Sequence, residues 1–220
     1  MQQMIEVRDL VKNYGDFCAV NHISFSVETG KIFGFLGPNG AGKTTTIKML
    51  TTVLVPSSGT VRVNGHDPTH DQKEVRRSFG IVFQDPSLDD ELTAQENLRY
   101  FASLYPGQKC LSPAEALRQV GLDPALQRPF GQYSQGMRQR TSLARVLLPI
   151  PELLLLDEPF SNMDVESVQQ MVELLSGFRQ GNRTIVITTH QRDAAAPIAD
   201  WVLALKAGRV ASFEPGSPTK

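Results

Sequence analysis

The feature that most constrains this chain is a glycine-rich loop between an apolar run and a helix-compatible segment. Residues 37–44 read Gly-Pro-Asn-Gly-Ala-Gly-Lys-Thr, after the apolar run 32–36 and before the segment 45–50. This order of strand, glycine loop and helix is that of a phosphate-binding P-loop. A glycine turn with a chance lysine is the alternative. The flanking patterns favour the phosphate-binding interpretation.

The P-loop pattern predicts a role for each of its residues. Glycines let the backbone approach a ligand closely, and the loop N–H groups converge on phosphate at the positive end of the next helix. Lys43 is predicted to reach the β- and γ-phosphates, and the Thr44 hydroxyl to ligate Mg²⁺. The other predicted contacts are Gly37, Pro38, Asn39, Gly40, Ala41, Gly42 and Thr45.

An acidic pair ends a second apolar run. Four leucines, residues 153–156, lead into Asp157 and Glu158. Such short runs are typical of parallel strands buried on both faces, and ligands bind at the carboxyl ends of these strands. Asp157 is predicted to contact Mg²⁺ directly or through water, and Glu158 to polarise the water that attacks the γ-phosphate. Two solvated acids at a strand end are the alternative, which the nearby P-loop disfavours.

The remaining patterns predict an α/β fold, with a P-loop core, an antiparallel β subdomain and an inserted α-helical subdomain. Strands are expected at 23–27, 60–63, 81–83 and 185–187, and a closing hairpin over 201–211. Apolar residues recur at helical spacing from 85 to 148, and a helical stripe is expected at Val165, Val168, Val172, Leu175 and Phe178. We therefore predict one domain, with the core and β subdomain over 1–84 and 150–220 and the helical subdomain over 85–149.

Composition excludes several classes of protein. The chain has 220 residues, 40% of them hydrophobic, which is typical of a globular domain, and its net charge of −1 argues against a nucleic-acid partner. The two cysteines, Cys18 and Cys110, have no metal-binding spacing and suit a reducing cytoplasm. The N-terminus has no signal-peptide pattern and no run of 18 apolar residues occurs, so we expect no membrane span.

Further segments resemble the ABC-type ATPases over essentially the whole chain. Residues 133–140, Tyr-Ser-Gln-Gly-Met-Arg-Gln-Arg, are similar to the family's Leu-Ser-Gly-Gly-Gln signature segment. Gln84 matches the family's Q-loop, Ser-Asn-Met-Asp at 161–164 its D-loop, and Thr-Thr-His at 188–190 its switch histidine. Tyr14 matches the aromatic residue that stacks on adenine.

The resemblance implies a site completed by a second ATPase subunit. It implies that Ser134, Gln135 and Gly136 contact the γ-phosphate of a nucleotide held by that subunit. It also implies that Asp164 makes contacts across the dimer interface. It also implies that Gln84 contacts Mg²⁺ or water and that His190 holds the γ-phosphate. A simpler role stays open for each residue. Ser134 and Asp164 are then only helix caps, and Tyr14 is only a packing aromatic. Gln84 is then an ordinary loop residue, and His190 an ordinary residue at a strand end.

The signature segment departs from the family pattern at three positions. Tyr133 replaces leucine, Gln135 the first glycine and Met137 glutamine. Because Gln135 carries a Cβ, we expect it either to crowd the phosphate or to require a different backbone.

The resemblance implies an ATP-binding and ATP-hydrolysing subunit of an ABC transporter. Residues 34–50 and 82–89 are similar to daunorubicin-resistance exporter ATPases, and residues 157–161 and 188–191 share features with haem-exporter ATPases. An exporter is therefore expected, with ATP and Mg²⁺ as ligands and a separate membrane-spanning permease as partner. The working unit is expected to be a homodimer or a dimer with a homologous subunit, at the cytoplasmic face of the membrane. A regulatory nucleotide-binding protein with little hydrolysis is the alternative.

Overall fold

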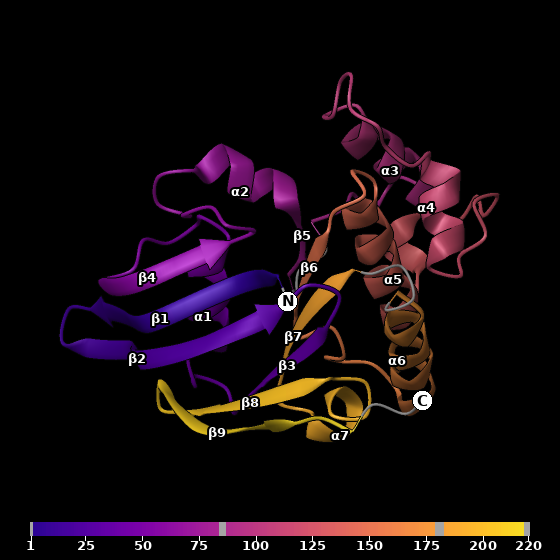
Figure 1. The fold of residues 1–220 in the computed structure, drawn as a ribbon. Helices are drawn as coiled ribbons and strands as arrows, with labels where there is room; N and C mark the ends of the chain where they lie inside the picture. Colours follow the sequence, from indigo (N-terminus) through magenta and orange to yellow (C-terminus); the bar gives the residue numbers. More distant parts are fainter. Residues whose placement is uncertain (1, 84–86, 179–182, 218–220) are drawn as a thin grey trace.

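The computed structural model describes residues 2–83, 87–178 and 183–217, arranged around two β-sheets (Figure 1). The smaller sheet is antiparallel, in the order β2 (Phe17–Glu28), β1 (Gln3–Tyr14), β4 (Ser58–Val63). Alternating buried and exposed residues along β2 leave one face of this sheet for the core. It is the predicted antiparallel β subdomain.

The larger sheet carries the predicted α/β core. Its order is β5 (Phe79–Val82), β6 (Leu153–Asp157), β7 (Thr184–Thr189), β3 (Ile32–Leu36), β8 (Trp201–Lys206), β9 (Arg209–Pro215). The first five strands are parallel, and β9 closes the edge as the antiparallel partner of β8. This edge is the predicted C-terminal hairpin.

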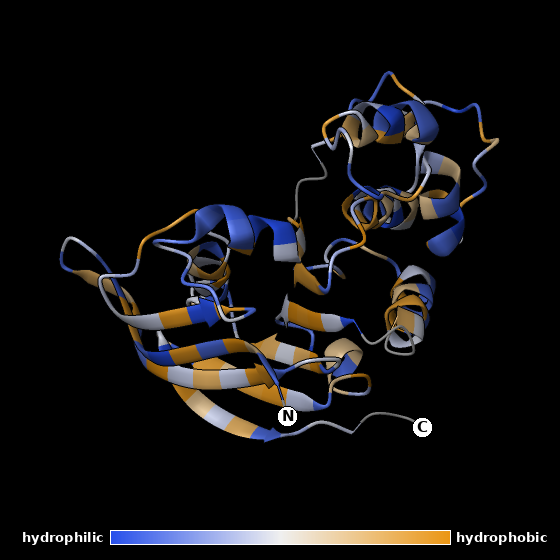
Figure 2. Cartoon of the chain, turned by 45° about the horizontal axis from the view of Figure 1, so that its top comes forward, coloured by the Kyte–Doolittle hydropathy of each residue, from blue (hydrophilic) through white to orange (hydrophobic). Residues whose placement is uncertain are grey.

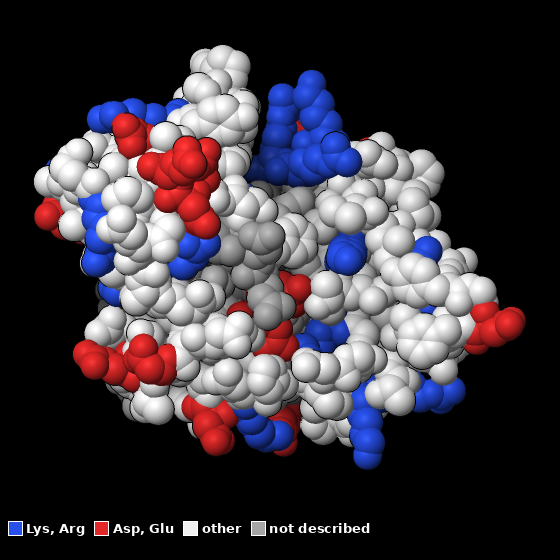
Figure 3. Space-filling model, turned by 180° about the vertical axis from the view of Figure 1, so that it is seen from behind, with Lys and Arg blue, Asp and Glu red and all other residues white. Residues whose placement is uncertain are grey.

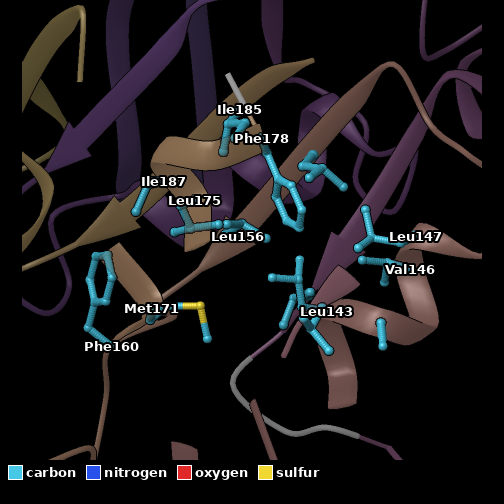
Figure 4. Close-up of a cluster of buried hydrophobic side chains, with 14 of the residues drawn as sticks. Leu143, Val146, Leu147, Leu156, Phe160, Met171, Leu175, Phe178, Ile185 and Ile187 are labelled. Carbon is cyan, nitrogen blue, oxygen red and sulfur yellow. The ribbon is translucent and has the colours of Figure 1, made fainter. Parts of the chain in front are cut away.

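The apolar runs of the central strands result from burial on both faces. In β6, Leu153 and Leu155 join a core shared with the antiparallel sheet and α1 (Lys43–Leu50). Leu154 and Leu156 point to the opposite core, under α5 (Gln135–Leu147) and α6 (Val165–Phe178). Figure 4 shows α5 and α6 side chains meeting those of β6 and β7, and Figure 2 shows the apolar inner faces of these elements.

The segment between β5 and β6 is helical, as the apolar spacing predicts. It contains α3 (Ala94–Ala102), α4 (Pro113–Gln119), a short 3₁₀ turn at Phe130–Gln132 and α5. Capping boxes start α3 and α4, where hydrogen bonds from Thr93 and Ser112 lower the pKa values of Glu96 and Glu115. The predicted division at residues 85–149 stays a prediction.

Two other helices flank the sheets, α2 (Gln72–Ser78) and the short α7 (Arg192–Ala195). The predicted stripe on α6 is wrong at its first position, because Val165 is 88% exposed at the start of the helix. Met171, which the stripe omitted, is buried instead. Across the three described ranges, no helix is both long enough and apolar enough to cross a bilayer.

Candidate active site

Three neighbouring strands bring the predicted phosphate loop, acidic pair and histidine to one sheet edge. β6, β7 and β3 are adjacent and parallel, so their carboxyl ends lie together. Asp157 is in register with Thr188, and Leu36 with Thr189. The segments that follow these residues therefore meet, although the loop lies more than 100 residues before the other two in the sequence.

Two of the loop glycines, Gly37 and Gly42, are required by the protein's own packing. A Cβ at Gly37 would lie 2.5 Å from the carbonyl oxygen of Leu205, and one at Gly42 would lie 2.6 Å from that of Ala19. Gly42 also adopts φ 102°, directly before α1. The loop is thus clamped between β2 and β8, and its backbone is held in place before any ligand binds.

Lys43, the first residue of α1, is held inside the loop by carbonyl groups and a carboxylate. Its side chain is 5% exposed, and Nζ donates to the carbonyl oxygens of Gly37 (2.7 Å) and Pro38 (3.2 Å). Nζ also lies 3.1 Å from Oε1 of Glu158. A buried ammonium needs such compensation, and a phosphate oxygen would supply the same charge as the carboxylate.

Glu158 lies between Lys43 and His190. Its Oε2 is 3.0 Å from Nδ1 of His190, which is 47% exposed at the end of β7. Its Oε1 faces Lys43 without hydrogen-bond geometry, and this buried oxygen accepts no hydrogen bond from a described residue. The backbone of Glu158 has φ 53°, a conformation that costs a non-glycine residue about 1–3 kcal/mol. This oxygen, on a strained residue, has a charged neighbour but no hydrogen-bond donor among the described residues, which points to a role in the site's chemistry.

Asp157 has the surroundings of a cation ligand. Its side chain is 5% exposed and accepts hydrogen bonds from the hydroxyls of Thr44 (3.0 and 3.2 Å) and Thr188. Both of these donors are neutral, so the buried carboxylate is left with negative charge to balance. Within the described ranges no three acidic, histidine or cysteine side chains cluster as a metal cage. One carboxylate and one hydroxyl suit Mg²⁺, which keeps waters and takes further oxygens from substrate phosphates.

A cavity of about 350 Å³ extends from the loop to the β1–β2 turn. Tyr14 lies at its rim, 49% exposed, with the ammonium of Lys12 5.4 Å from the ring centroid. Phe17 lines the same cavity, opposite Tyr14 across the hairpin. The sequence reading missed Phe17, although the two-residue turn between these aromatics gives the signal. The cavity is also lined by Asn39, Gly40, Ala41, Gly42, Lys43, Thr44, Thr45, Asp157 and Glu158.

The predicted signature and D-loop residues form a second cluster, away from this cavity. Ser134 caps α5, its hydroxyl accepting from the N–H of Met137 (3.3 Å). Asp164 caps α6, accepting from the N–H of Ser167 (2.7 Å), and these hydrogen bonds lower its pKa. A Cβ at Gly136 would lie 2.7 Å from Oγ of Ser167, so this glycine lets the two helix starts meet. None of the four predicted residues, Ser134, Gln135, Gly136 and Asp164, lines the loop cavity.

Gln135 has an ordinary helical backbone. Gln135 is the first residue of α5 and is absent from the residues with positive φ, so its backbone is that of an ordinary helix. A Cβ is compatible with this backbone, and no altered conformation is needed. Gln84, the other predicted Mg²⁺ contact, lies outside the described residues.

Comparisons with known proteins find a family match and relatives along most of the chain. Residues 20–161 match the family model described as ABC transporter. The chain is 37% identical over 96% of its length to a bacitracin transport ATP-binding protein of Bacillus licheniformis, covering 69% of that protein. It is 39% identical over 94% of its length to a daunorubicin/doxorubicin resistance ATP-binding protein of Streptomyces peucetius, covering 63% of it.

A solved structure shares the fold. It is a dimeric, post-hydrolysis ATP-binding cassette bound to ADP and phosphate, with a TM-score of 0.84 and 26% sequence identity. The match covers 96% of this chain and 98% of that one. The likeness therefore includes both parts of the site. One is the loop half, which contains residues 37–44, Asp157 and Glu158, and the other is the Ser134 half, which contains residues 134–136 and Asp164.

Proposed function

This chain belongs to the ABC transporter family, and we propose that it is the ATP-hydrolysing subunit of an exporter whose membrane-spanning part is a separate protein. Two relatives that it resembles are named for bacitracin transport and for daunorubicin/doxorubicin resistance. These names favour export of a drug-like compound. Since the chain spans 69% and 63% of these relatives, the cargo and partner rest on this proposal.

The site residues divide the hydrolysis chemistry between them. Lys43 and the loop N–H groups bind the β- and γ-phosphates and offset the charge that develops on the transferred phosphoryl group. Thr44 and Asp157 would hold Mg²⁺, which when bound neutralises phosphate charge. His190 orients Glu158 and reaches toward the γ-phosphate. Tyr14 and Phe17 provide aromatic surface for the base.

One observation carries the hydrolytic role: Oε1 of Glu158 faces the charge of Lys43 at 3.1 Å but has no hydrogen-bond donor among the described residues. This buried oxygen accepts no hydrogen bond from a described residue, while Oε2 is fixed by His190. A second cavity of about 240 Å³ opens beside it, lined by Asn39, Glu158, Ser161, Asn162, His190 and Gln191. A water in this cavity would pass a proton to the Glu158 carboxylate as its oxygen bonds to the γ-phosphorus, and the bond from that phosphorus to the bridging oxygen would break to release ADP.

A second subunit would supply the missing contacts on the other side of the phosphates. Ser134 begins α5, and a helix N-terminus of this kind attracts phosphate. In this chain it lies apart from the cavity that holds Lys43. We therefore place the nucleotide between the loop of one copy and the Ser134 segment of another, or of a homologous subunit.

This chain has a suitable docking surface for the membrane partner beside its helical segment. A cavity of about 460 Å³ lies between β5, α3 and α5, and its lining includes Arg76, Phe79, Phe101, Leu104, Tyr105 and Arg145. Basic side chains gather over α2 at its rim (Figure 3). Mixed apolar and basic lining suits a cytoplasmic segment of the permease. This docking would hold the chain peripherally at the cytoplasmic face of the membrane.

The direct test compares ATP hydrolysis by the wild type and by Glu158→Gln. The amide cannot accept a proton, so we expect turnover to fall by about 10²–10⁴-fold while ATP still binds. Phosphate release measures the first quantity and calorimetric ATP titration the second. Equal rates for the two proteins would reject the enzyme and favour the regulatory alternative.

A further inference from the structure

We propose that Thr188 is a positioning residue that fixes Asp157 and Glu158 for the bound magnesium nucleotide. The proposal rests on the proposed function of the same site. Thr188 lies on β7, next to β6, and is fully buried. It contacts both acidic residues, yet its side chain does not line either cavity beside Glu158.

The Thr188 hydroxyl has one proton, and the geometry directs it to Asp157. Its Oγ1 donates a hydrogen bond to Oδ1 of Asp157. The competing acceptor, the carbonyl oxygen of Leu156, lies at 3.5 Å, the outer limit of a hydrogen bond. The hydroxyl therefore donates to the carboxylate and keeps its lone pairs for other donors.

The same residue also holds the backbone of Glu158. The N–H of Glu158 donates to the carbonyl oxygen of Thr188 at 2.9 Å and lies 3.3 Å from its Oγ1. These contacts fix the residue where the chain turns into the left-handed φ of 53°. Thr188 thus holds the side chain of one acid and the backbone of the next.

Thr188 differs from Thr44, the other hydroxyl on Asp157. Thr44 is exposed beside the loop, 3.0 and 3.2 Å from the two carboxylate oxygens, where it can ligate Mg²⁺ itself. Thr188 approaches Asp157 from within the sheet. Partners of this kind orient a ligand without touching the metal, and losing one typically weakens metal binding by about 10–100-fold.

The other threonines of β7 provide a matched control. The hydroxyl of Thr184 accepts from the N–H of Gly30 at 3.0 Å, at the opposite end of the strand. The hydroxyl of Thr189 accepts from the N–H of Gln191. Thr184→Val therefore removes a buried hydroxyl from the same strand but leaves both acidic residues unaltered.

The test measures how strongly Mg²⁺ increases affinity for a non-hydrolysable ATP analogue. Calorimetric titrations with Mg²⁺ and with EDTA give two dissociation constants, whose ratio is the Mg²⁺ coupling. For Thr188→Val we expect the coupling to fall at least about tenfold. The EDTA value should stay within about twofold of the wild type. Thr184→Val should keep the wild-type coupling, and Thr188→Ser, which retains the hydroxyl, should restore it.

Wild-type coupling in Thr188→Val would overturn the proposal, as would equal losses in Thr188→Val and Thr184→Val. If the valine variant does not fold, Thr188→Ser and Thr188→Ala provide the same test, since they differ by one oxygen. Equal coupling in that pair would also overturn it. Failure of the proposed function is distinguishable, because the wild type would then release no phosphate from ATP, whereas the analogue titrations would still report the Mg²⁺ coupling.

Discussion

The loop half and the Ser134 half of this molecule differ in how completely each site is built. In the loop half, Lys43 and Asp157 are each 5% exposed and already bound to groups of the same chain. In the other half, Ser134 is exposed, and its hydroxyl is used to cap its own helix. The register of β6, β7 and β3 positions the residues of the loop half. The contact between the first turns of α5 and α6 positions those of the Ser134 half.

This difference indicates which half can act alone. The loop half has the charge, the carboxylates and the cavity for a nucleotide, so one copy should bind ATP. Hydrolysis needs donors on the far side of the γ-phosphate, and the Ser134 half of the same copy lies outside the loop cavity. Binding should therefore survive changes at Ser134, and turnover should not.

The largest effect on binding is expected from Lys43→Ala. This change removes the ammonium that the loop carbonyls hold in place. A charged hydrogen bond to phosphate contributes about 1.5–3 kcal/mol, so ATP affinity should fall by at least about tenfold. Calorimetric titration measures the change. Lys48→Ala is the control, because Lys48 lies on the exposed side of the same helix. Equal affinities for the two variants would contradict the loop assignment.

A much smaller effect is expected from Gln135→Gly, in the other half. Since Gln135 already has a helical backbone, glycine relieves no strain there. Glycine lowers helix stability by up to about 1 kcal/mol, so we expect a slightly lower melting temperature and turnover within about twofold of the wild type. Thermal unfolding and phosphate release measure the two quantities. A clear gain in turnover would show that the Gln135 side chain crowds the phosphate.

The sequence predicted the loop half better than the rest, for a physical reason. Strand burial and the glycine loop are local patterns, and parallel strands then bring Asp157 and His190 to the loop. The packing of Gly136 against Ser167 depends on how two distant helices meet, which no local pattern records. Val165 illustrates the same limit, because helical spacing predicted burial while the surrounding chain leaves it exposed.

Thr188 and Phe17 were missed for different reasons. In the sequence, Thr188 is recognisable only as part of the motif that ends in His190. Its contact with Asp157 depends on the register between β6 and β7, which the sequence does not show. Phe17 follows a two-residue turn after Tyr14, and the hairpin that pairs them was readable from the sequence. The predicted residue Gln84 falls outside the described ranges, and its role stays a prediction.

The central claim is that each site combines the loop of one copy with the Ser134 segment of another. The most direct measurement mixes Lys43→Ala chains with Ser134→Phe chains, in which the bulky ring blocks close approach to the phosphate. Each variant alone should hydrolyse little ATP. A mixed dimer contains one intact site, so the mixture should release phosphate well above the sum of its two components. A rate equal to that sum would contradict the account.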